Sequence, residues 1–579
     1  MLALRMRQVL VVGLVWAWGA GMLGCGDDEG PPAPGDDAGA PGDGGPHEPL
    51  GDESDPLFEP DRLLEIEIEL DPADWEVLRH EHHDARAFAE TCPSGWPESP
   101  YTVFPGTITI DGETVADVGV RKKGFLGSIT PERPSLKISF DETVPDRTYL
   151  GLSRMTLNNN RQDASQANTC LAYRVFREAG VPAPRCNHAR VTVNGQYLGT
   201  YSHVESIRRS MLARWFGDDG GNLYEGAVAD LRPIWVDDYE SKPGNDDDRA
   251  DLQALIDVLA TDGPDLEARL APSLDVDAFT TFWAAEVLVD HWDGYTGNAN
   301  NHYLYRDPGN GRFYFLPWGP DSAFGQVNPF VDFEVPTSLF ATTILPSRLH
   351  ALPEARARYQ ARLLELLDRA WDEDALLAEV DRIEQMLVDH IVVDPDAFAA
   401  DLERIREFIR GRRAAIEADV ARDPEWPGEL RASPCLRQIG TASGTFSSAF
   451  GSFPAANPFT AGTGTLELTL NGTPEVFTDY GVSAGPVGGA ADRQLAVGVI
   501  GLREDYTFMG AILAVEPSRY EAGAVLDVDM YGVQAQLVEG EGLVARPRAF
   551  ALGTLRLDEV EAFEGGTVSG RFDLDLWWL

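Results

Sequence analysis

The stretch HWDGYTGNANNHYLYR, residues 291–306, together with the short DSAFG, residues 321–325, decides the predicted fold of this chain. Asp293 stands at the end of a segment with helical periodicity, and three asparagines follow it closely. A hairpin pattern then leads to a second aspartate, Asp321, just ahead of Ser-Ala-Phe-Gly. An acid, amides and a second acid on adjoining turns predict a site for a metal ion and a phosphate.

The spacing inside this stretch suggests a role for each polar side chain. Asp293 and Asn298 have the Asp-x-x-x-x-Asn spacing of a phosphotransfer catalytic loop, in which the aspartate accepts the acceptor's proton and the asparagine holds a divalent metal. For an isolated Asp and Asn, caps of a helix end and a turn are the commoner explanation. Asp321, directly after a predicted strand, can coordinate a Mg²⁺ ion that bridges nucleotide phosphates, and its presence favours the phosphotransfer interpretation.

The amino-terminal half is predicted to be rich in strands. From residue 57 to about 149, apolar and polar residues alternate between Gly and Asp turns, which indicates an antiparallel sheet with one short helix near PADWEVLRHE. Helical periodicity follows over residues 163–179 and ends at Gly180. A hairpin comes next, with its turn at Asn194-Gly195.

A third group of candidate residues lies in this strand-rich half. In RKKGFLGS, Gly124 and Gly127 would let backbone N–H groups approach a phosphate, and Lys137 in the strand SLKISF would reach the same phosphates. An ordinary surface lysine on a hairpin is the alternative for Lys137. Glu205, at a predicted strand end, is a candidate partner that orients Lys137 by an ion pair, and a solvated carboxylate is the alternative there.

The carboxyl-terminal half divides into a helical region and a strand region. Beyond residue 251, four segments carry apolar residues at helical spacing, interrupted by the hairpin NNHYLYRDPGNGRFYFLPW. A strand-rich part followed by a helix-rich part, with polar residues at their junction, predicts an α+β domain of two lobes around a cleft over residues 57–423. Residues 432–579 show short alternating strands with Gly-rich turns, which predict a separate β-sandwich or barrel.

Composition limits the functions that this chain can have. Its 579 residues exceed what one core usually organises, so two or three domains are expected. The formal net charge is −47, and such a field repels nucleic acid and anionic membrane surfaces. We therefore expect no nucleic-acid function and a membrane contact only through a lipid anchor.

The amino terminus has the pattern of an export signal. Residues 1–25 contain two arginines and a short apolar run that ends in MLGC, and this resembles a bacterial lipobox in which Cys25 is lipidated. An ordinary cleaved signal is the alternative. Residues 26–56 are almost wholly Gly, Pro, Asp and Glu, so they predict a disordered tether. Four cysteines then remain in an oxidising compartment, with three possible pairings among them: Cys92, Cys170, Cys186 and Cys435.

The run from Leu57 to about Asp423 resembles the spore-coat protein H (CotH) kinase family, an atypical protein-kinase-like fold. The motifs that carry the resemblance are RKKGFLGS with PSLKISF, FREAGVPAPRCNHARVTVNGQYLGTYSHVE, GNLYEG and HWDGYTGNANNHYLYRDPGNGRFYFLPWGPDSAFG. The resemblance implies transfer of phosphate from ATP to protein serine or threonine with Mg²⁺ or Mn²⁺, and therefore a protein substrate or surface partner. It also implies that Lys137 contacts the nucleotide, that Asp293 is the helix-end aspartate, and that Asn301 is the family's asparagine before the aromatic strand. Since kinase spacing favours Asn298, both asparagines stay as metal candidates.

One departure from the family pattern bears directly on activity. The family typically has Pro-Trp-Asp-x-Asp before Phe-Gly, whereas this chain has PWGPD, so Gly319 replaces the first aspartate and Asp321 stands alone. If the first aspartate is the indispensable metal ligand, the chain is a poor kinase or a pseudokinase. The alternative to an exported kinase is therefore a kinase-like surface lipoprotein that acts as an adhesion or interaction module.

Overall fold

The computed structural model describes residues 51–86, 99–124, 130–242, 244–245, 248–328, 331, 333–431, 434–453, 457–487, 494–541 and 544–578. These residues belong to two compact units. The larger unit contains residues 51–82 and 99–434, and the β unit contains residues 83–86 and 435–578. The predicted export signal, Cys25 and most of the predicted tether lie outside the described residues. Among the helices that are described, none has the length and apolar character needed to cross a bilayer.

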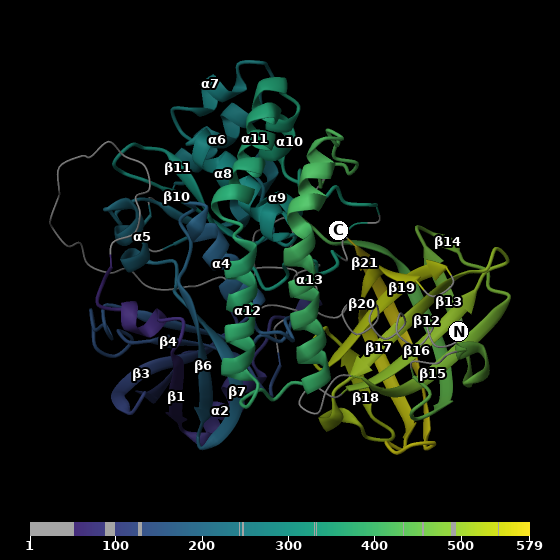
Figure 1. Ribbon diagram of the computed structural model, residues 1–579. Coiled ribbons are helices and arrows are strands. Elements are labelled where there is room, and N and C mark those ends of the chain that lie inside the picture. Colours follow the sequence, from purple (N-terminus) through teal and green to yellow (C-terminus); the bar gives the residue numbers. More distant parts are fainter. Residues whose placement is uncertain are drawn as a thin grey trace. The chain divides into compact units, whose positions relative to one another are not determined.

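The amino-terminal part of the larger unit is a closed barrel with strand order β1-β2-β3-β4-β5-β7-β6 (Figure 1). Alternation produces it, because every second residue of LLEIEIEL from Leu64 to Leu70 is buried in the barrel core. The antiparallel sheet predicted over residues 57–149 is confirmed, since β1 to β4 pair antiparallel in sequence order. A parallel pairing of β1 with β6, which lies beyond that range, closes the barrel. The strands are β1 (Leu63–Leu70), β2 (Phe104–Ile110), β3 (Glu113–Lys123), β4 (Ser135–Ser139), β5 (Arg154–Asn158), β6 (Cys186–Val193) and β7 (Gln196–Val204).

Local signals in this half are confirmed. Helix α2 (Pro72–His80) begins where the Asp71 side chain accepts a hydrogen bond from the Ala73 N–H at 2.8 Å. The turn between β6 and β7 places Asn194 and Gly195 at φ of 50° and 78°, the backbone conformation that an Asn-Gly hairpin turn needs. Helix α4 (Asn168–Glu178) is shorter than predicted, because residues 163–167 form a loop instead of a first helical turn.

The carboxyl-terminal part of the larger unit is helical and encloses a small sheet with the order β11-β10-β8-β9. Its central helix α8 is buried almost throughout, and Trp283 of α8 stacks on Tyr359 of α11 with ring centroids 3.7 Å apart. The predicted α+β class and the predicted helices are confirmed. The elements are α5 (Arg209–Phe216), β8 (Leu223–Gly226), β9 (Tyr239–Ser241), α6 (Ala250–Leu259), α7 (Leu266–Leu270), α8 (Val276–Val289), α9 (Tyr295–Asn298), β10 (His302–Arg306), β11 (Phe313–Pro317), α10 (Ile344–His350), α11 (Pro353–Arg369), α12 (Glu373–Leu387) and α13 (Pro395–Val420).

The β unit is built from one ten-stranded sheet, of the order β14-β13-β12-β21-β20-β19-β17-β16-β15 with β18 beside β20. The sheet curls, so that β15 packs against β12 and β13, and it encloses a large apolar core. A smaller buried cluster is formed by Phe453, Ala496, Ile512 and Val538. The predicted all-β character is confirmed, although the strands form one curled sheet and not two stacked ones. The strands are β12 (Arg437–Ala449), β13 (Gly462–Leu470), β14 (Thr473–Pro474), β15 (Asp479–Val487), β16 (Gln494–Leu502), β17 (Thr507–Val515), β18 (Val525–Val528), β19 (Val533–Glu541), β20 (Val544–Val560) and β21 (Thr567–Trp578).

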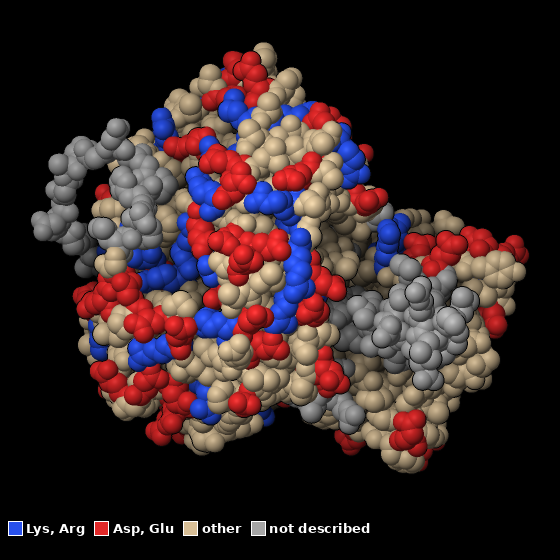
Figure 2. Space-filling view, in the orientation of Figure 1, with Lys and Arg blue, Asp and Glu red and all other residues tan. Residues whose placement is uncertain are grey.

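One of the disulfide pairings that the sequence left open is now fixed. Cys170 of α4 and Cys186 of β6 form a disulfide, which ties helix α4 to the barrel. Cys435 is also disulfide-bonded. Figure 2 shows acidic and basic side chains interleaved on one face of the molecule. The ion pairs of the chain include Arg406–Asp381 at 2.8 Å.

Candidate functional site

The site is centred on the carboxylate of Asp293, which lies in the short segment between α8 and α9. Helix α8 ends at Val289, and the next residue, Asp290, has a left-handed conformation at φ 59° that turns the chain toward α9. Asp293 is buried and accepts three amide hydrogen bonds. Its Oδ1 accepts from Asn298 Nδ2 at 2.7 Å and from Asn300 Nδ2 at 3.2 Å, and its Oδ2 accepts from Asn301 Nδ2 at 2.9 Å. The three asparagines of the opening stretch therefore converge on one acid.

Burial determines the protonation of this acid. Burial and, to a smaller extent, the negative charge of Asp321 raise the pKa of Asp293, whereas the amides of Asn298 and Asn300 and the guanidinium of Arg431 oppose the rise, and the resulting pKa is about 8. A carboxyl group with a pKa near neutral pH is well matched to exchange a proton with a hydroxyl group, and it accepts that proton when it is in the carboxylate form. The electrostatic coupling also places Asp293 and Asp321 in one site.

A second buried acid holds the loop that carries these residues. Glu286 of α8 accepts hydrogen bonds from the backbone N–H groups of Tyr295 and Thr296, both at 2.9 Å, and from the Thr296 hydroxyl at 2.6 Å. These are the first residues of α9, whose amide groups have no partner inside the helix. Burial raises the pKa of Glu286 to about 8, and the same hydrogen bonds oppose this rise. Glu286 thus fixes the start of the turn that ends at Asn298.

The DSAFG loop brings in the second aspartate. Asp321 is partly exposed, and its backbone carbonyl accepts a hydrogen bond from Asn168 Nδ2 at 2.8 Å, which ties the loop to α4. Burial raises the pKa of Asp321 to about 6, and the positive charge of Lys123 lowers it. Further along, the ring of Phe324 packs against Trp371 and Phe408 of the helical part.

Gly319 lies beside Asn301 in this loop. Its N–H donates to the Tyr173 hydroxyl at 3.1 Å, and its φ is 50°. A Cβ atom placed on Gly319 would stand 3.2 Å from Asn301 Oδ1. The family's aspartate at this position would therefore project its carboxylate next to the amide of Asn301. The glycine removes one acidic ligand from the immediate neighbourhood of that asparagine.

The barrel contributes a lysine to the site, and it is Lys123 that the electrostatics identify. Lys123 Nζ donates to Asn158 Oδ1 at 2.6 Å, lies 5.6 Å from the centre of the Trp318 ring, and interacts with Asp321. Lys137 is buried on β4, where its neighbours Leu136 and Ile138 point into the barrel core, so alternation places Lys137 on the outer face.

The structure differs from the prediction at Glu205, the proposed partner of Lys137. The predicted pairing of Glu205 with Lys137 is wrong, because both Glu205 oxygens are taken by arginines. Oε1 accepts from Arg185 at 2.8 Å and Oε2 accepts from Arg214, in a buried cluster that is better served by two guanidinium groups than by one ammonium. Gly124 is described, with φ of 120° and its carbonyl accepting from the Tyr101 hydroxyl. Gly127 lies outside the described residues.

The donor set suits a divalent cation held by few protein ligands. In the part of the chain that the structure describes, no three His, Cys, Asp or Glu side chains gather as a metal cluster. Mg²⁺ in phosphotransferases is bound by one or two carboxylates together with the substrate's phosphates, so Asp321 and Asn301 are a sufficient set. Among the described residues, Asn301 uses its Nδ2 toward Asp293 and its Oδ1 accepts no hydrogen bond. Asn298 is less suitable, because its Oδ1 accepts from Arg431 Nη2 at 2.6 Å.

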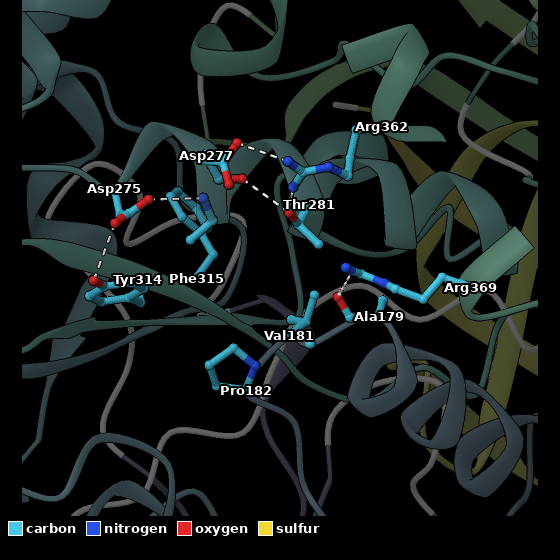
Figure 3. A pocket seen from close by; sticks show the side chains of 12 residues that line it. Ala179, Val181, Pro182, Asp275, Asp277, Thr281, Tyr314, Phe315, Arg362 and Arg369 are labelled. Atoms are coloured by element: carbon cyan, nitrogen blue, oxygen red, sulfur yellow. Dashed lines mark hydrogen bonds and ion pairs between the residues drawn. The ribbon is translucent and has the colours of Figure 1, made fainter. Parts of the chain in front are cut away.

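A cavity of about 320 Å³ lies at the opposite end of α8 (Figure 3). Asp275 and Asp277 line it at the start of the helix, and since α8 has 14 residues its two ends are about 20 Å apart. Arg362 donates to Asp277 at 2.9 Å and Tyr314 donates to Asp275 at 3.3 Å. This cavity is therefore distinct from the site at Asp293, and its acidic side chains are already engaged by neighbours.

Three candidate functional residues were given no role by the sequence analysis. Lys123 had a signal, since RKK is conspicuous in so acidic a chain. Glu286 had a weaker one, as a lone acid in the apolar run FWAAEVLV. Arg431 had none, because it reaches Asn298 from 133 positions further along the chain.

Comparison with known proteins gives a family match and several relatives. The family model described as CotH kinase protein matches residues 120–416. Inner spore coat protein H of Bacillus subtilis is 27% identical over 34% of this chain and 56% of its own length. Invasin CotH2 of Rhizopus delemar is 28% identical over 41% of this chain and 42% of its own length. The chain thus spans about half the length of these two relatives. The crystal structure of the Helicobacter pylori proinflammatory kinase CtkA matches at 10% identity over 49% of this chain and 92% of that one, with a TM-score of 0.25.

Proposed function

The chain belongs to the CotH kinase protein family, and from that premise we propose that it is an ATP- and metal-dependent kinase that phosphorylates serine or threonine hydroxyls of proteins outside the cytoplasm. The observation that carries the proposal is the set of three amide hydrogen bonds to Asp293, in a site that also contains Asp321. An acid held this way has a fixed position and a pKa suited to proton transfer. A capping role alone does not require three side-chain donors on one buried carboxylate.

The chemistry assigned to the site is a direct phosphoryl transfer. The oxygen of the acceptor hydroxyl forms a bond to the γ-phosphorus of ATP, and the bond from that phosphorus to the β,γ-bridging oxygen breaks, so that ADP leaves with the electron pair. The hydroxyl proton passes to the carboxylate of Asp293. Since the amides of Asn298, Asn300 and Asn301 hold that carboxylate, its orientation is set before the substrate arrives.

The remaining residues bind and orient the nucleotide. Asp321 and Asn301 are the proposed ligands of a Mg²⁺ or Mn²⁺ ion, which would neutralise charge on the phosphates. Lys123, which faces Asp321, and Lys137, on the outer face of β4, are the candidate lysines for the phosphates. Gly124 stays a candidate for backbone approach to a phosphate. Glu205 is not part of the proposed nucleotide site, because Arg185 and Arg214 engage both of its oxygens.

Location outside the cytoplasm is supported by the sequence of residues 1–56. The export signal with its lipobox-like end at Cys25 and the Gly, Pro and acidic tether fit an envelope lipoprotein. The two relatives bear names that describe a spore coat protein and an invasin, which are proteins of outer surfaces. Replacement of Cys25 by serine should release the chain from membranes, and unchanged membrane retention would argue against lipidation.

A second candidate function is a kinase-like surface module that binds a partner without catalysis. Gly319 in place of the family's aspartate favours it, because the immediate surroundings of Asn301 have lost a carboxylate. The scarcity of ATP outside the cytoplasm favours it too.

The decisive experiment incubates the full-length chain with labelled ATP, Mg²⁺ or Mn²⁺, and a hydroxyl-bearing acceptor protein. We expect label to enter the acceptor, and we expect Asp293→Ala and Asp321→Ala to abolish it. An exposed acid of α11, Asp368, supplies the control variant Asp368→Ala. No label with either metal, together with no shift in melting temperature on addition of ATP and metal, would overturn the kinase proposal and favour the binding module.

A further inference from the structure

The segment that follows α13 carries an arginine into the candidate site. After α13 ends at Val420, the chain is fastened by ion pairs from Arg356 to Asp423 at 3.3 Å and to Glu425 at 2.9 Å. Trp426 packs edge-on against Phe333, with ring centroids 5.3 Å apart. These contacts hold the segment against the helical part, and Arg431 further along it reaches Asn298 in the Asp293 loop.

Arg431 is held at both its backbone and its side chain. Its carbonyl accepts a hydrogen bond from the guanidinium of Arg232, which itself donates to the buried Asp230 at 2.7 Å. Its Nη2 donates to Asn298 Oδ1 at 2.6 Å. Arg431 is therefore a fixed part of the site and not a surface side chain that happens to lie near it.

One nitrogen of this guanidinium has no partner among the residues that the structure describes. Arg431 Nη1 is buried and makes no hydrogen bond with any of them. A buried donor on a charged group that lacks an acceptor costs about 1–3 kcal/mol or more, so each such group calls for an explanation. An anion bound in the site would supply the missing acceptor. The proposed substrate, ATP, brings such anionic oxygens.

Arg431 lies where protein kinases bind a metal ion. In protein kinases the asparagine of the catalytic loop holds one of two Mg²⁺ ions. Here the residue with that spacing, Asn298, offers its carbonyl oxygen to a guanidinium instead. Burial lowers the pKa of Arg431 to about 10, and the carboxylate of Asp293 opposes the change, so the group stays positive at neutral pH.

We propose that Arg431 is a phosphate-binding residue, whose guanidinium takes the place of a second divalent cation at Asn298 and whose Nη1 donates to a phosphate oxygen of the bound nucleotide. This inference rests on the proposed function. The planar fork of arginine suits the role, because one nitrogen binds Asn298 while another faces the ligand. The site then uses one metal ion, at Asp321 and Asn301. A carboxylate at position 319 is not needed, because there is no second metal ion for it to bind.

Nucleotide affinity gives the first test. In the full-length chain, Arg431→Ala should weaken the binding of ATP, measured by isothermal titration calorimetry with Mg²⁺ present, by about 10- to 100-fold. Arg431→Lys keeps the positive charge but loses the planar fork of the guanidinium, so its affinity for ATP should lie between those of the wild type and Arg431→Ala. Arg410, on the exposed side of α13 with half of its side chain accessible, provides the control Arg410→Ala, which should bind ATP as the wild type does. Thermal melting of each variant identifies any that fail to fold, and Arg431→Lys then carries the test.

Counting metal ions gives the second test. Electron paramagnetic resonance should find one Mn²⁺ per bound nucleotide in the wild type, and more than one in Arg431→Ala, since Asn298 becomes available. Unchanged or tighter ATP binding by a folded Arg431→Ala would overturn this inference, as would two Mn²⁺ ions in the wild type. Both of these outcomes leave the proposed kinase intact if phosphate transfer is observed. A wild-type chain that binds no ATP with either metal overturns the inference and the proposed function together.

Discussion

The amide of Asn298 donates to the carboxylate of Asp293 at 2.7 Å, so the residues at the two ends of the Asp-x-x-x-x-Asn spacing are in direct contact. The contact orients Asp293, and it turns Asn298 so that its carbonyl oxygen faces Arg431 at 2.6 Å. One side chain thus links the proposed proton acceptor to the proposed phosphate ligand. Replacing Asp293 or Arg431 should therefore also change the orientation of Asn298, and with it the position of the other residue.

Asp293 should make the folded chain less stable as the pH rises. Its pKa is about 8 when folded, whereas a free aspartate titrates near about 3.9, so between these values the folded state keeps a proton that the unfolded state has lost. The stabilisation is complete below the pKa of the unfolded chain, about 3.9, and is lost as the pH rises through the folded pKa of about 8. Asp293→Asn removes this titration and should flatten the fall in melting temperature between pH 5 and pH 8, measured without ligands. Asp368→Asn, at an exposed acid, should leave the slope as it is. An equal slope in Asp293→Asn and wild type would contradict the assignment.

The local part of this site was predictable, and the long-range part was not. Asp293 and the asparagines lie within a few positions of one another, so a helix end and a turn suffice to bring them together. Arg431 comes from 133 positions beyond Asn298. The choice of partner for Glu205 was likewise decided by which basic groups the fold packs around it, and spacing carries no information about that choice.

The barrel shows the same division. Alternation in LLEIEIEL predicts a strand with one buried face, and β1 has that face. Closure depends on the parallel pairing of β1 with β6, in which Leu63 lies opposite His188. Hairpins join neighbours in the sequence and leave a signal in the turn, whereas a parallel pair between distant strands leaves none.

Glu286 should act as a positioning residue for the Asp293 loop. Its two oxygens accept three hydrogen bonds from Tyr295 and Thr296, and a glutamine offers only one acceptor oxygen to the same donors. Glu286→Gln should lower stability by about 1–3 kcal/mol and reduce kcat by about tenfold or more, with little change in the KM for ATP. Thr296→Val removes only the hydroxyl bond and should have the smaller effect on both quantities. A loss confined to stability, with kcat unchanged, would mean that the acid supports the fold alone.

Lys123, more than Lys137, should control the ionisation of Asp321. Burial raises the pKa of Asp321 and the charge of Lys123 opposes the rise, which leaves the pKa at about 6. Lys123→Met should move the pH midpoint of Mn²⁺ binding to higher pH and weaken Mn²⁺ affinity at pH 6 by about 3- to 10-fold. Lys137→Met, on the next strand, is the matched variant and should leave that midpoint in place. A shift in Lys137→Met with none in Lys123→Met would reverse the assignment of the two lysines.

Gly319 offers the sharpest test of whether the site has lost a metal ligand. A Cβ at this position would lie 3.2 Å from Asn301 Oδ1, so the carboxylate of Gly319→Asp would enter the surroundings of the proposed metal. The backbone φ of 50° is left-handed, which costs an aspartate about 1–2 kcal/mol relative to glycine. Gly319→Ala bears the same backbone cost without a ligand, and Gly319→Asn adds an amide without a charge. We expect all three variants to melt at a lower temperature than the wild type.

Only Gly319→Asp should gain metal affinity, because a second carboxylate near Asn301 adds negative charge and an oxygen ligand for a hard cation. Titration with Mn²⁺ should show binding at least about tenfold tighter than in Gly319→Ala and Gly319→Asn. If phosphate transfer also increases, the wild-type chain is a kinase slowed by its glycine. If Mn²⁺ binds more tightly while transfer stays the same, the single carboxylate of Asp321 already suffices for catalysis. Equal Mn²⁺ affinity in the aspartate, asparagine and alanine variants would place the metal away from Asn301, and Asp321 would then need a different partner.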